Sequence, residues 1–330
     1  MNDFMITPSP HIRAKTTTTG IMFDVILAML PSAVAAVYFF GWRAMTIMVL
    51  AVVSAVATEA AIQLLCKKRV LIGDLSAVVT GILIAFGLPV TVPLWVPVVG
   101  SVFAIAIVKQ AFGGLGHNFM NPALAARAVL VASFPVIMTL FITPTLADTV
   151  TSATAEASNA YGIDALTGAT PLALMSTGET ADLPSLWRLF IGGVGGSLGE
   201  TSKLAILIGA VYLFIKRVIN PIIPVMFTVS TLLVVFLFGN KFDNYILYHL
   251  LTGALLLSAV FMATDYSSSA RTIPGQFIFG IGAGLITGFI RCFGSYPEGV
   301  TYGILVMNVA APLIDKLTKP RVYGEVRKSA

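Results

Sequence analysis

Hydrophobic runs of about 20 residues alternate with short polar segments along almost the whole chain. That length lets a helix cross the hydrocarbon core of a bilayer. A transmembrane β-barrel would instead show alternating segments of about 10 residues, which the sequence lacks. The pattern therefore predicts an all-α polytopic membrane protein with about ten transmembrane helices, near residues 21–40, 44–65, 75–91, 93–110, 122–143, 203–218, 221–238, 246–263, 274–291 and 300–317.

The composition agrees with this class. Hydrophobic residues make up 57% of the chain and charged residues 11%, whereas a soluble globular protein carries roughly 25% charged residues. The net charge of +5 is no sign of nucleic-acid binding, because in a membrane protein the placement of positive charge matters more than its sum. With the N-terminus inside, 15 of the 20 Lys and Arg residues fall on the inner side. We expect both termini to be cytoplasmic and the chain to lie in the cell inner membrane.

The same topology places the polar stretch 142–187 outside, where it contains acids but no Lys or Arg. "TGILIAFGLP" from Thr80 weakly resembles "TGALLLSAVF" from Thr252, and each half of the chain holds five spans. An odd number of spans inverts the second unit in the membrane, although apolar segments also resemble each other by chance. We predict two inverted five-helix repeats, over 21–143 and 203–317, with a cytoplasmic N-terminal segment 1–20, an external loop and broken segment 144–202 and a cytoplasmic tail 318–330.

Charged side chains inside a span are candidates for function, because their burial in lipid is costly. Asp24 is either such a group or an interfacial residue that a helix N-terminus stabilises. Glu59 lies deeper, so it belongs to a cation path, pairs with a neighbouring helix or reaches the interface. Asp265, Glu298 and Asp315 lie near helix ends, where interfacial or capping roles need no further function.

Two glycine-rich segments interrupt the apolar pattern. "GGLGHNFMNPALAARA" contains Asn118 and Asn121, with Asn121 suited to cap a helix that begins at Pro122. This segment is either a turn with a capped helix or a ligand site at the positive end of that helix. We expect His117 to be a solvated loop residue. "GGVGGSLGETS", residues 192–202, is either a surface linker or a re-entrant segment buried in protein; it lacks the Gly-Lys-Ser/Thr ending of a phosphate-binding loop.

The cysteines do not indicate a metal centre. Cys66 and Cys292 match no metal-binding spacing, and an iron–sulfur cluster normally requires about four thiolates. We expect two free thiols, no metal site and no catalytic side chain in this chain.

The segment "DALTGATPLA", residues 164–173, lies in the external loop. Thr170-Pro171 by itself predicts a helix N-cap followed by proline in the first turn. Thr167-Gly168-Ala169-Thr170, preceded by Asp164, resembles the flavinylation pattern Ser/Thr-Gly-Ala-Thr, in which the last threonine forms a phosphoester with FMN. Small residues before that threonine leave its hydroxyl open to a modifying enzyme.

With this motif, the chain resembles the NqrB/RnfD family, whose members are membrane subunits of the sodium-pumping NADH:quinone reductase and of the Rnf complex. The resemblance covers nearly the full length and is carried by "SPHIRAKTTTTGIMFDVILAMLP", "GGLGHNFMNPALAARAVL", "DALTGATPLA", "GGSLGETS" and "YPEGVTYGILVMNVAAPLID". The first segment and the chain length favour the Rnf member.

The resemblance implies a membrane subunit of a complex that passes electrons between ferredoxin and NAD, coupled to Na⁺ or H⁺ transport. Its partners would be the other Rnf subunits and the lipid bilayer. It also implies covalent FMN on Thr170, near Asp164, Thr167, Gly168 and Ala169. A noncovalent riboflavin is possible, with Asn118 and Asn121 as candidate ligands. The main alternative is an inverted-repeat solute transporter or channel without a redox cofactor, in which the external loop is only a lid.

Overall fold

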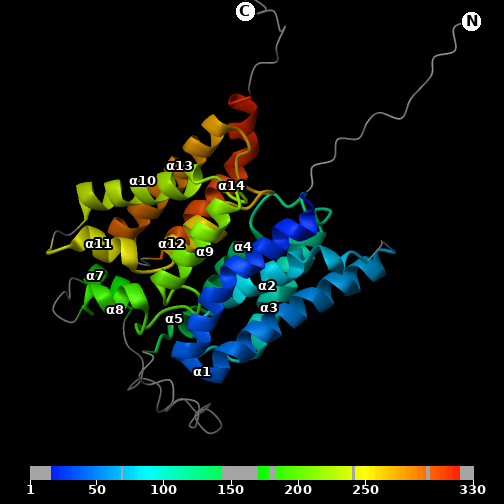
Figure 1. The fold of residues 1–330 in the computed structure, drawn as a ribbon, viewed down its shortest axis with the longest axis horizontal. Helices are drawn as coiled ribbons and strands as arrows, with labels where there is room; N and C mark the ends of the chain where they lie inside the picture. The colour runs from blue at the N-terminus through cyan, green and yellow to red at the C-terminus, as the bar shows by residue number, and fades with distance from the viewer. Residues whose placement is uncertain are drawn as a thin grey trace, which may run out of the picture.

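The fold is a bundle of α-helices in a computed structural model, drawn in Figure 1. The structure describes residues 16–67, 70–142, 170–177, 183–239, 242–294 and 298–319, and these contain no β-strand. Their helices are α1 (Thr18–Leu65), the 3₁₀-helix η1 (Ile72–Asp74), α2 (Ser76–Phe86), α3 (Trp95–Phe103), the π-helix η2 (Ala104–Gln110), α4 (Pro122–Ser133), α5 (Pro135–Thr139), α7 (Pro171–Thr177), α8 (Leu186–Ile191), α9 (Lys203–Ile215), α10 (Ile222–Phe238), α11 (Tyr245–Leu251), α12 (Leu255–Phe261), α13 (Ile273–Phe293) and α14 (Val300–Leu317).

Helix α1 comprises the first two predicted spans, which fold back on each other. Gly41 has φ 69° and ψ −163°, a conformation open essentially to glycine alone. The chain reverses there, and Figure 1 shows the two arms of α1 diverging from this bend. Arg43, just after the bend, donates from Nε to the carbonyl of Val90 at 2.8 Å. It also donates from Nη2 to the carbonyl of Val92 at 3.0 Å, so it binds the predicted hairpin loop between α2 and α3.

The helix bounds follow the predicted spans closely, with two interruptions. The span near 122–143 divides into α4 and α5 at Pro135, where the proline ring provides no N–H donor. The span near 246–263 divides into α11 and α12, and Gly253 between them has φ +66°. The uninterrupted helices predicted for these two spans are therefore wrong.

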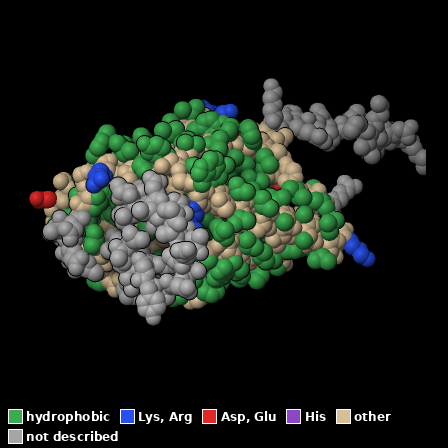
Figure 2. All heavy atoms as spheres, turned by 90° about the horizontal axis from the view of Figure 1, so that it is seen from below, with side chains coloured by type: hydrophobic (Ala, Val, Ile, Leu, Met, Phe, Trp, Pro, Cys, Tyr) green, Lys and Arg blue, Asp and Glu red, His purple; other side chains and the backbone are tan. Residues whose placement is uncertain are grey.

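The surface of the bundle is suited to a bilayer. α1, α13 and α14 are long and apolar enough to cross a membrane, and several shorter helices are equally apolar. Hydrophobic side chains cover much of the face in Figure 2. Large apolar residues of α1, α10 and α13 are exposed, among them Tyr38, Trp42, Val229 and Phe293. A surface of this kind is stable in contact with lipid tails and marks the chain as embedded in a membrane.

Close packing of small residues holds the helices together. A Cβ atom on Gly284 of α13 would lie 2.5 Å from the carbonyl oxygen of Phe227 on α10, and one on Gly209 of α9 would lie 2.1 Å from the carbonyl oxygen of Ala28 on α1. Such approaches are typical of helix association in membranes. α1 packs on α9, and α4 packs on α14. Helices from the N-terminal part of the chain therefore contact helices from its C-terminal part.

Candidate functional site

Thr170 lies immediately before α7 and is half-buried. Its Oγ1 accepts a hydrogen bond from the N–H of Ala173 at 3.2 Å, and its carbonyl accepts one from Leu174 at 2.9 Å. Pro171 occupies the first turn, where its missing N–H has no consequence. The predicted cap at Thr170 is therefore confirmed, and the cap holds the side-chain oxygen at a fixed place.

A cavity beside Thr170 is lined by four segments that are distant in sequence. Its walls come from the start of α7, from α8 and the glycine-rich segment after it, from the break between α11 and α12, and from the residue preceding Gly299. The lining residues are Thr170, Pro171, Leu172, Leu189, Val194, Gly195, Gly196, Glu200, Thr201, Lys203, Leu251, Thr252, Gly253 and Glu298. The glycine-rich segment thus faces the residue that the flavinylation pattern singles out.

The segment 192–202 is non-helical, and its second half is buried in protein. The N–H of Leu198 donates to the carbonyl of Leu88 at 3.0 Å, and that of Gly199 donates to the carbonyl of Phe86 at 3.0 Å. These bonds supply partners for backbone that would otherwise be costly at membrane depth. The segment is therefore a non-helical stretch whose second half is buried in protein, unlike an exposed surface linker, and its re-entry into the membrane stays a prediction.

Three buried charged residues, Glu200, Lys203 and Glu298, line this cavity; with Arg127 and Arg291 next to them they form what we name the Thr170 cluster. Arg127 of α4 forms an ion pair with Glu298. Lys203, the first residue of α9, interacts electrostatically with Glu200, Arg291 and Glu298. The exposed fractions of the cluster lie between 3% and 8%. Glu298 is therefore not the interfacial acid that its position near a helix end predicted, because Arg127 compensates its charge inside the protein.

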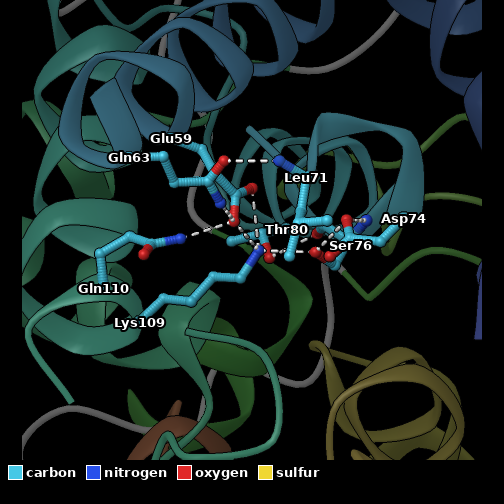
Figure 3. Close-up of polar contacts among 8 residues, drawn as sticks. All are labelled: Glu59, Gln63, Leu71, Asp74, Ser76, Thr80, Lys109 and Gln110. Atoms are coloured by element: carbon cyan, nitrogen blue, oxygen red, sulfur yellow. Dashed lines mark hydrogen bonds and ion pairs between the residues drawn. The ribbon is translucent and has the colours of Figure 1, made fainter. Parts of the chain in front are cut away.

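A second group of buried polar residues, which we name the Glu59 cluster, lies within the first half of the chain (Figure 3). Lys109 Nζ lies 2.8 Å from Glu59 Oε1 and donates to Ser76 Oγ at 2.6 Å. Gln110 Nε2 also donates to Glu59 Oε1, at 2.7 Å, and Gln63 Nε2 does so at 3.5 Å. Glu59 therefore pairs with a neighbouring helix, one of the three roles that its position allowed.

The π-helix η2 explains how both Lys109 and Gln110 reach Glu59. Consecutive residues of a regular α-helix point about 100° apart. In η2 the wider turn brings both side chains to one carboxylate. Ser76 Oγ then donates to Asp74 Oδ1 at 2.7 Å, so a continuous chain of hydrogen bonds runs from Glu59 to the half-buried Asp74.

Asn118 and Asn121 are buried and line one cavity. Asn121 caps α4 as predicted, since its Oδ1 accepts from the N–H groups of Ala123 at 3.0 Å and Leu124 at 3.2 Å. Its Nδ2 donates to the carbonyl of Met262 at 3.0 Å. Asn118 Nδ2 donates to the carbonyl of Met120 at 3.1 Å. The cavity volume is about 80 Å³, which is room for water molecules at roughly 30 Å³ each and too little for a whole flavin.

The remaining candidates have simpler outcomes. Asp164, Thr167, Gly168 and Ala169 lie outside the described residues. His117 is exposed, as expected. Both cysteines are free, and the described part of the chain contains no group of three or more His, Cys, Asp and Glu side chains that could hold a metal ion.

Three acidic residues near helix ends accept hydrogen bonds from other parts of the fold or from the adjacent turn. Asp24 accepts a hydrogen bond from the Tyr212 hydroxyl at 2.7 Å. Asp315 Oδ1 accepts from the N–H of Arg271 at 2.9 Å, and Asp265 accepts from Ser267 and Ser268. Asp265 and Asp315 therefore have the capping and turn roles that their positions allowed.

Lys203, Arg291 and Gly253 were not predicted as residues of the site. Lys203 and Arg291 are bases at the ends of predicted apolar spans. Their position at the ends of apolar spans was a usable signal, because a buried base near a break in a span indicates an anion or a counter-ion. Gly253 had no comparable signal.

Known proteins resemble this chain over its whole length. Residues 5–324 match the family described as NQR2, RnfD, RnfE. The D subunit of the Na(+)-translocating ferredoxin:NAD(+) oxidoreductase complex of Acetobacterium woodii is 50% identical, covering 100% of this chain and 99% of the relative. The D subunit of the proton-translocating ferredoxin:NAD(+) oxidoreductase complex of Clostridium ljungdahlii is 39% identical, covering 99% and 98%. The D subunit of the ion-translocating oxidoreductase complex of Shewanella amazonensis is 40% identical, covering 97% and 98%. The chain therefore belongs to the NQR2, RnfD, RnfE family.

Proposed function

We propose that this chain is the membrane subunit of an ion-translocating ferredoxin:NAD oxidoreductase complex and carries FMN esterified to Thr170. The full-length similarity to the D subunits of such complexes supports the assignment to the complex. The position of Thr170 at the edge of a cavity with buried charges supports the flavin. The other subunits of the complex are the partners, and Na⁺ or H⁺ is the transported ion.

The cavity beside Thr170 has a volume of about 20 Å³ as packed, so its donor set, and not its volume, supports a flavin phosphate. Glu200 Oε2, Ser197 Oγ and Arg291 Nε are buried without a hydrogen-bond partner, and native interiors leave few such atoms unless a ligand completes them. Gly253 and Gly196 keep the wall open, since a Cβ on either would meet Arg291 or Glu200 within 3.1 Å. A bound flavin would supply the electron-transfer chemistry, and the chain would supply attachment, position and electrostatics.

The attachment is a single phosphoryl transfer. Thr170 Oγ1 forms a bond to the flavin-side phosphorus of a flavin dinucleotide, the pyrophosphate P–O bond breaks, and the nucleoside monophosphate leaves while the hydroxyl proton is released. This step is not a redox reaction, because no electrons are transferred. The half-buried position of Thr170 at the start of a short helix leaves its oxygen accessible to a transferase.

We also propose a membrane topology for the chain. The ten spans form two inverted repeats in the inner membrane, with both termini cytoplasmic. The contacts of α1 with α9 and of α4 with α14 support this arrangement, because they join corresponding units of the two halves, as a pseudo-two-fold axis would. The uneven distribution of Lys and Arg supports the orientation.

Riboflavin remains an expectation from the resemblance, with Asn118 and Asn121 as its ligands. The cavity as packed is too small for it, and the amide of Asn121 is already engaged on both of its polar atoms. We therefore assign no step to riboflavin.

The covalent flavin has a direct test. The complex is purified from cells that contain a flavin transferase and is denatured on a gel, and the band of this 34.9 kDa chain is examined for flavin fluorescence. We expect fluorescence in the wild type, its loss in Thr170→Ala and its retention in Thr170→Ser, which keeps a hydroxyl. A dark wild-type band whose Thr170 peptide has its unmodified mass would overturn the flavin assignment and favour the transporter.

A further inference from the structure

A second cavity adjoins α7, the helix that begins directly after Thr170. We name it the α7 cavity, and its lining from α7, α10, α11 and α13 includes Leu172, Phe238, His249, Arg291, Cys292 and Phe293. Its volume is about 300 Å³, compared with about 20 Å³ for the cavity beside Thr170. Pockets that hold small organic ligands begin at about 300 Å³, so the α7 cavity has room for a ligand ring and the smaller cavity does not.

Two buried side chains of the α7 cavity carry polar atoms that have no hydrogen-bond partner among the described residues. These atoms are His249 Nδ1 and Arg291 Nε, and the two residues are 8% and 5% exposed. Arg291 donates from its other nitrogens to the carbonyls of His249 at 2.6 Å and Thr252 at 3.1 Å, which holds the guanidinium in place. Native interiors leave few such atoms unless a ligand completes them, so a ligand of this cavity should offer hydrogen-bonding groups to both residues.

The α7 cavity lies within reach of Thr170. A Cβ atom on Gly253 would be 3.1 Å from Arg291 Nη2 and also 3.1 Å from Leu172 Cδ2, so both side chains pack against this glycine. Leu172 is the second residue after Thr170, and it lines both the cavity beside Thr170 and the α7 cavity. A ring that is joined to Thr170 Oγ1 through a flexible chain therefore has a short path past Leu172 to Arg291.

The isoalloxazine ring of a flavin matches the lining of the α7 cavity. Its dimethylbenzene end is apolar, and its pyrimidine end has several acceptors and one N–H donor. Phe238 and Phe293 contribute aromatic surface, with their ring centroids 5.8 Å apart, and a flat ring packs well against such side chains. Arg291 Nε only donates, whereas Nδ1 of a neutral His249 either donates or accepts. The two atoms therefore suit the mixed pattern of the pyrimidine end.

We propose that the α7 cavity binds the isoalloxazine ring of the flavin on Thr170, with Arg291 and His249 at the pyrimidine end. This inference rests on the proposed function and adds the place of the ring. The phosphate remains at Thr170, and the ribityl chain passes Leu172. Among the residues that the structure describes, Arg291 is the only Lys or Arg that lines this cavity. Reduced flavin carries its negative charge at the pyrimidine end, so this guanidinium stabilises the reduced form and raises the midpoint potential.

The two cysteines of the chain test the place of the ring without any substitution at the site. Cys292 is half-buried in the lining of the α7 cavity, and Cys66 is exposed at the end of α1. The assembled complex is purified with and without co-expressed flavin transferase and is treated with a small thiol reagent. Peptide masses then give the loading at Thr170 and the labelling of both cysteines. Loading should slow the labelling of Cys292 about tenfold, as expected when the open state of the cavity falls to about a tenth, and should leave Cys66 unchanged.

The midpoint potential of the flavin is the second test. It is titrated in the loaded complex, with the Thr170→Ala complex, which lacks this flavin, subtracted as the blank. Arg291→Gln should lower the ratio of reduced to oxidised flavin at least about tenfold, which is about 30 mV for a two-electron couple. Arg291→Lys keeps the charge and should lose only part of this. Arg188→Gln removes the same charge from an exposed position of α8 and should leave the potential unchanged, since solvent screens it.

A pair of variants at His249 tests the other hydrogen bond. His249→Leu removes the polar atom, so the ring is held less firmly and the labelling of Cys292 in the loaded complex should rise towards its rate in the unloaded complex. His249→Asn keeps a polar atom near the place of Nδ1 and should preserve the protection. Equal protection in the wild type and in His249→Leu would remove His249 from the ring site.

Two results would overturn the proposal while leaving the covalent flavin intact. One is labelling of Cys292 at the same rate in the loaded and unloaded wild type. The other is an unchanged potential in Arg291→Gln, which decides the matter if neighbouring subunits shield Cys292 even without flavin. The labelling of the wild type decides it if Arg291→Gln does not accumulate. An unmodified Thr170 peptide in the wild type would instead remove the proposed function itself.

Discussion

The Glu59 cluster and the Thr170 cluster are both buried and charged, yet they differ in how completely their polar atoms have partners. Glu59 and Lys109 are each 2% exposed, form one neutral ion pair, and have partners for their buried polar atoms among the described residues. The Thr170 cluster leaves Glu200 Oε2 and Arg291 Nε without a hydrogen-bond partner among the described residues. Native interiors leave few such atoms unless a ligand completes them, so our proposal places a ligand at the second cluster.

The two clusters also differ in the segments that surround them. The Glu59 cluster joins side chains of α1, α2 and η2 (Figure 3), and Glu59, Gln63 and Gln110 line a cavity of about 670 Å³. The Thr170 cluster lies where both halves meet, among non-helical segments with two glycine positions that keep a wall open. Irregular backbone lines cavities in membrane proteins, and it does so at both clusters, since the non-helical Leu71, Gly113 and Gly114 line a cavity beside Glu59.

The largest expected effect is at the neutral pair. Glu59→Gln leaves Lys109 as an unpaired buried cation, which should cost about 3–5 kcal/mol of stability. The double variant Glu59→Gln/Lys109→Met removes both charges and should recover most of the loss. The half-unfolding temperature and the amount of folded subunit in membranes measure both. Equal stability of the single and double variants would show that the pair does not neutralise Lys109.

The buried pair of Arg127 and Glu298 should respond to the loss of either member. In protein without flavin, Glu298→Gln removes the carboxylate that pairs with Arg127 and should cost about 3–5 kcal/mol. Arg127→Gln leaves the buried Glu298 without this cation and should cost a similar amount. The same unfolding measurement tests both, and a substitution that costs nothing would show that the pair does not compensate the buried charges.

A smaller effect is expected from the wall of the cavity. Gly253→Ala places a Cβ at 3.1 Å from Arg291 Nη2 and Leu172 Cδ2 in a left-handed conformation, which should cost about 1–2 kcal/mol from the backbone alone and should lower flavin loading. Gly116→Ala has the same kind of strain, with φ +87° and nothing within 4 Å, and should leave loading unchanged. The mass of the Thr170 peptide distinguishes the two, and equal loading would show that the wall does not matter.

The sequence by itself determined the helices and their caps. Apolar runs of membrane-spanning length predicted α9, α10, α13 and α14 almost to the residue, because lipid leaves a helical backbone few alternatives. Asn121 and Thr170 were identifiable as caps because a short polar side chain followed by proline satisfies the first N–H groups locally. The flavinylation motif was also recognisable from its residues alone. The first residues of this motif lie outside the described part of the chain.

Only the tertiary structure decided which charges meet. Arg127 and Glu298 are 171 residues apart, and no local pattern links them. The π-helix that directs both Lys109 and Gln110 to Glu59 depends on packing against α1. Lys203 and Arg291 both lie close to Gly253, at the break between α11 and α12, where glycine has no Cβ atom to obstruct them. The charges that meet in a buried site come from segments that are distant in sequence. Which acids and bases compensate each other is therefore settled only when the helices assemble.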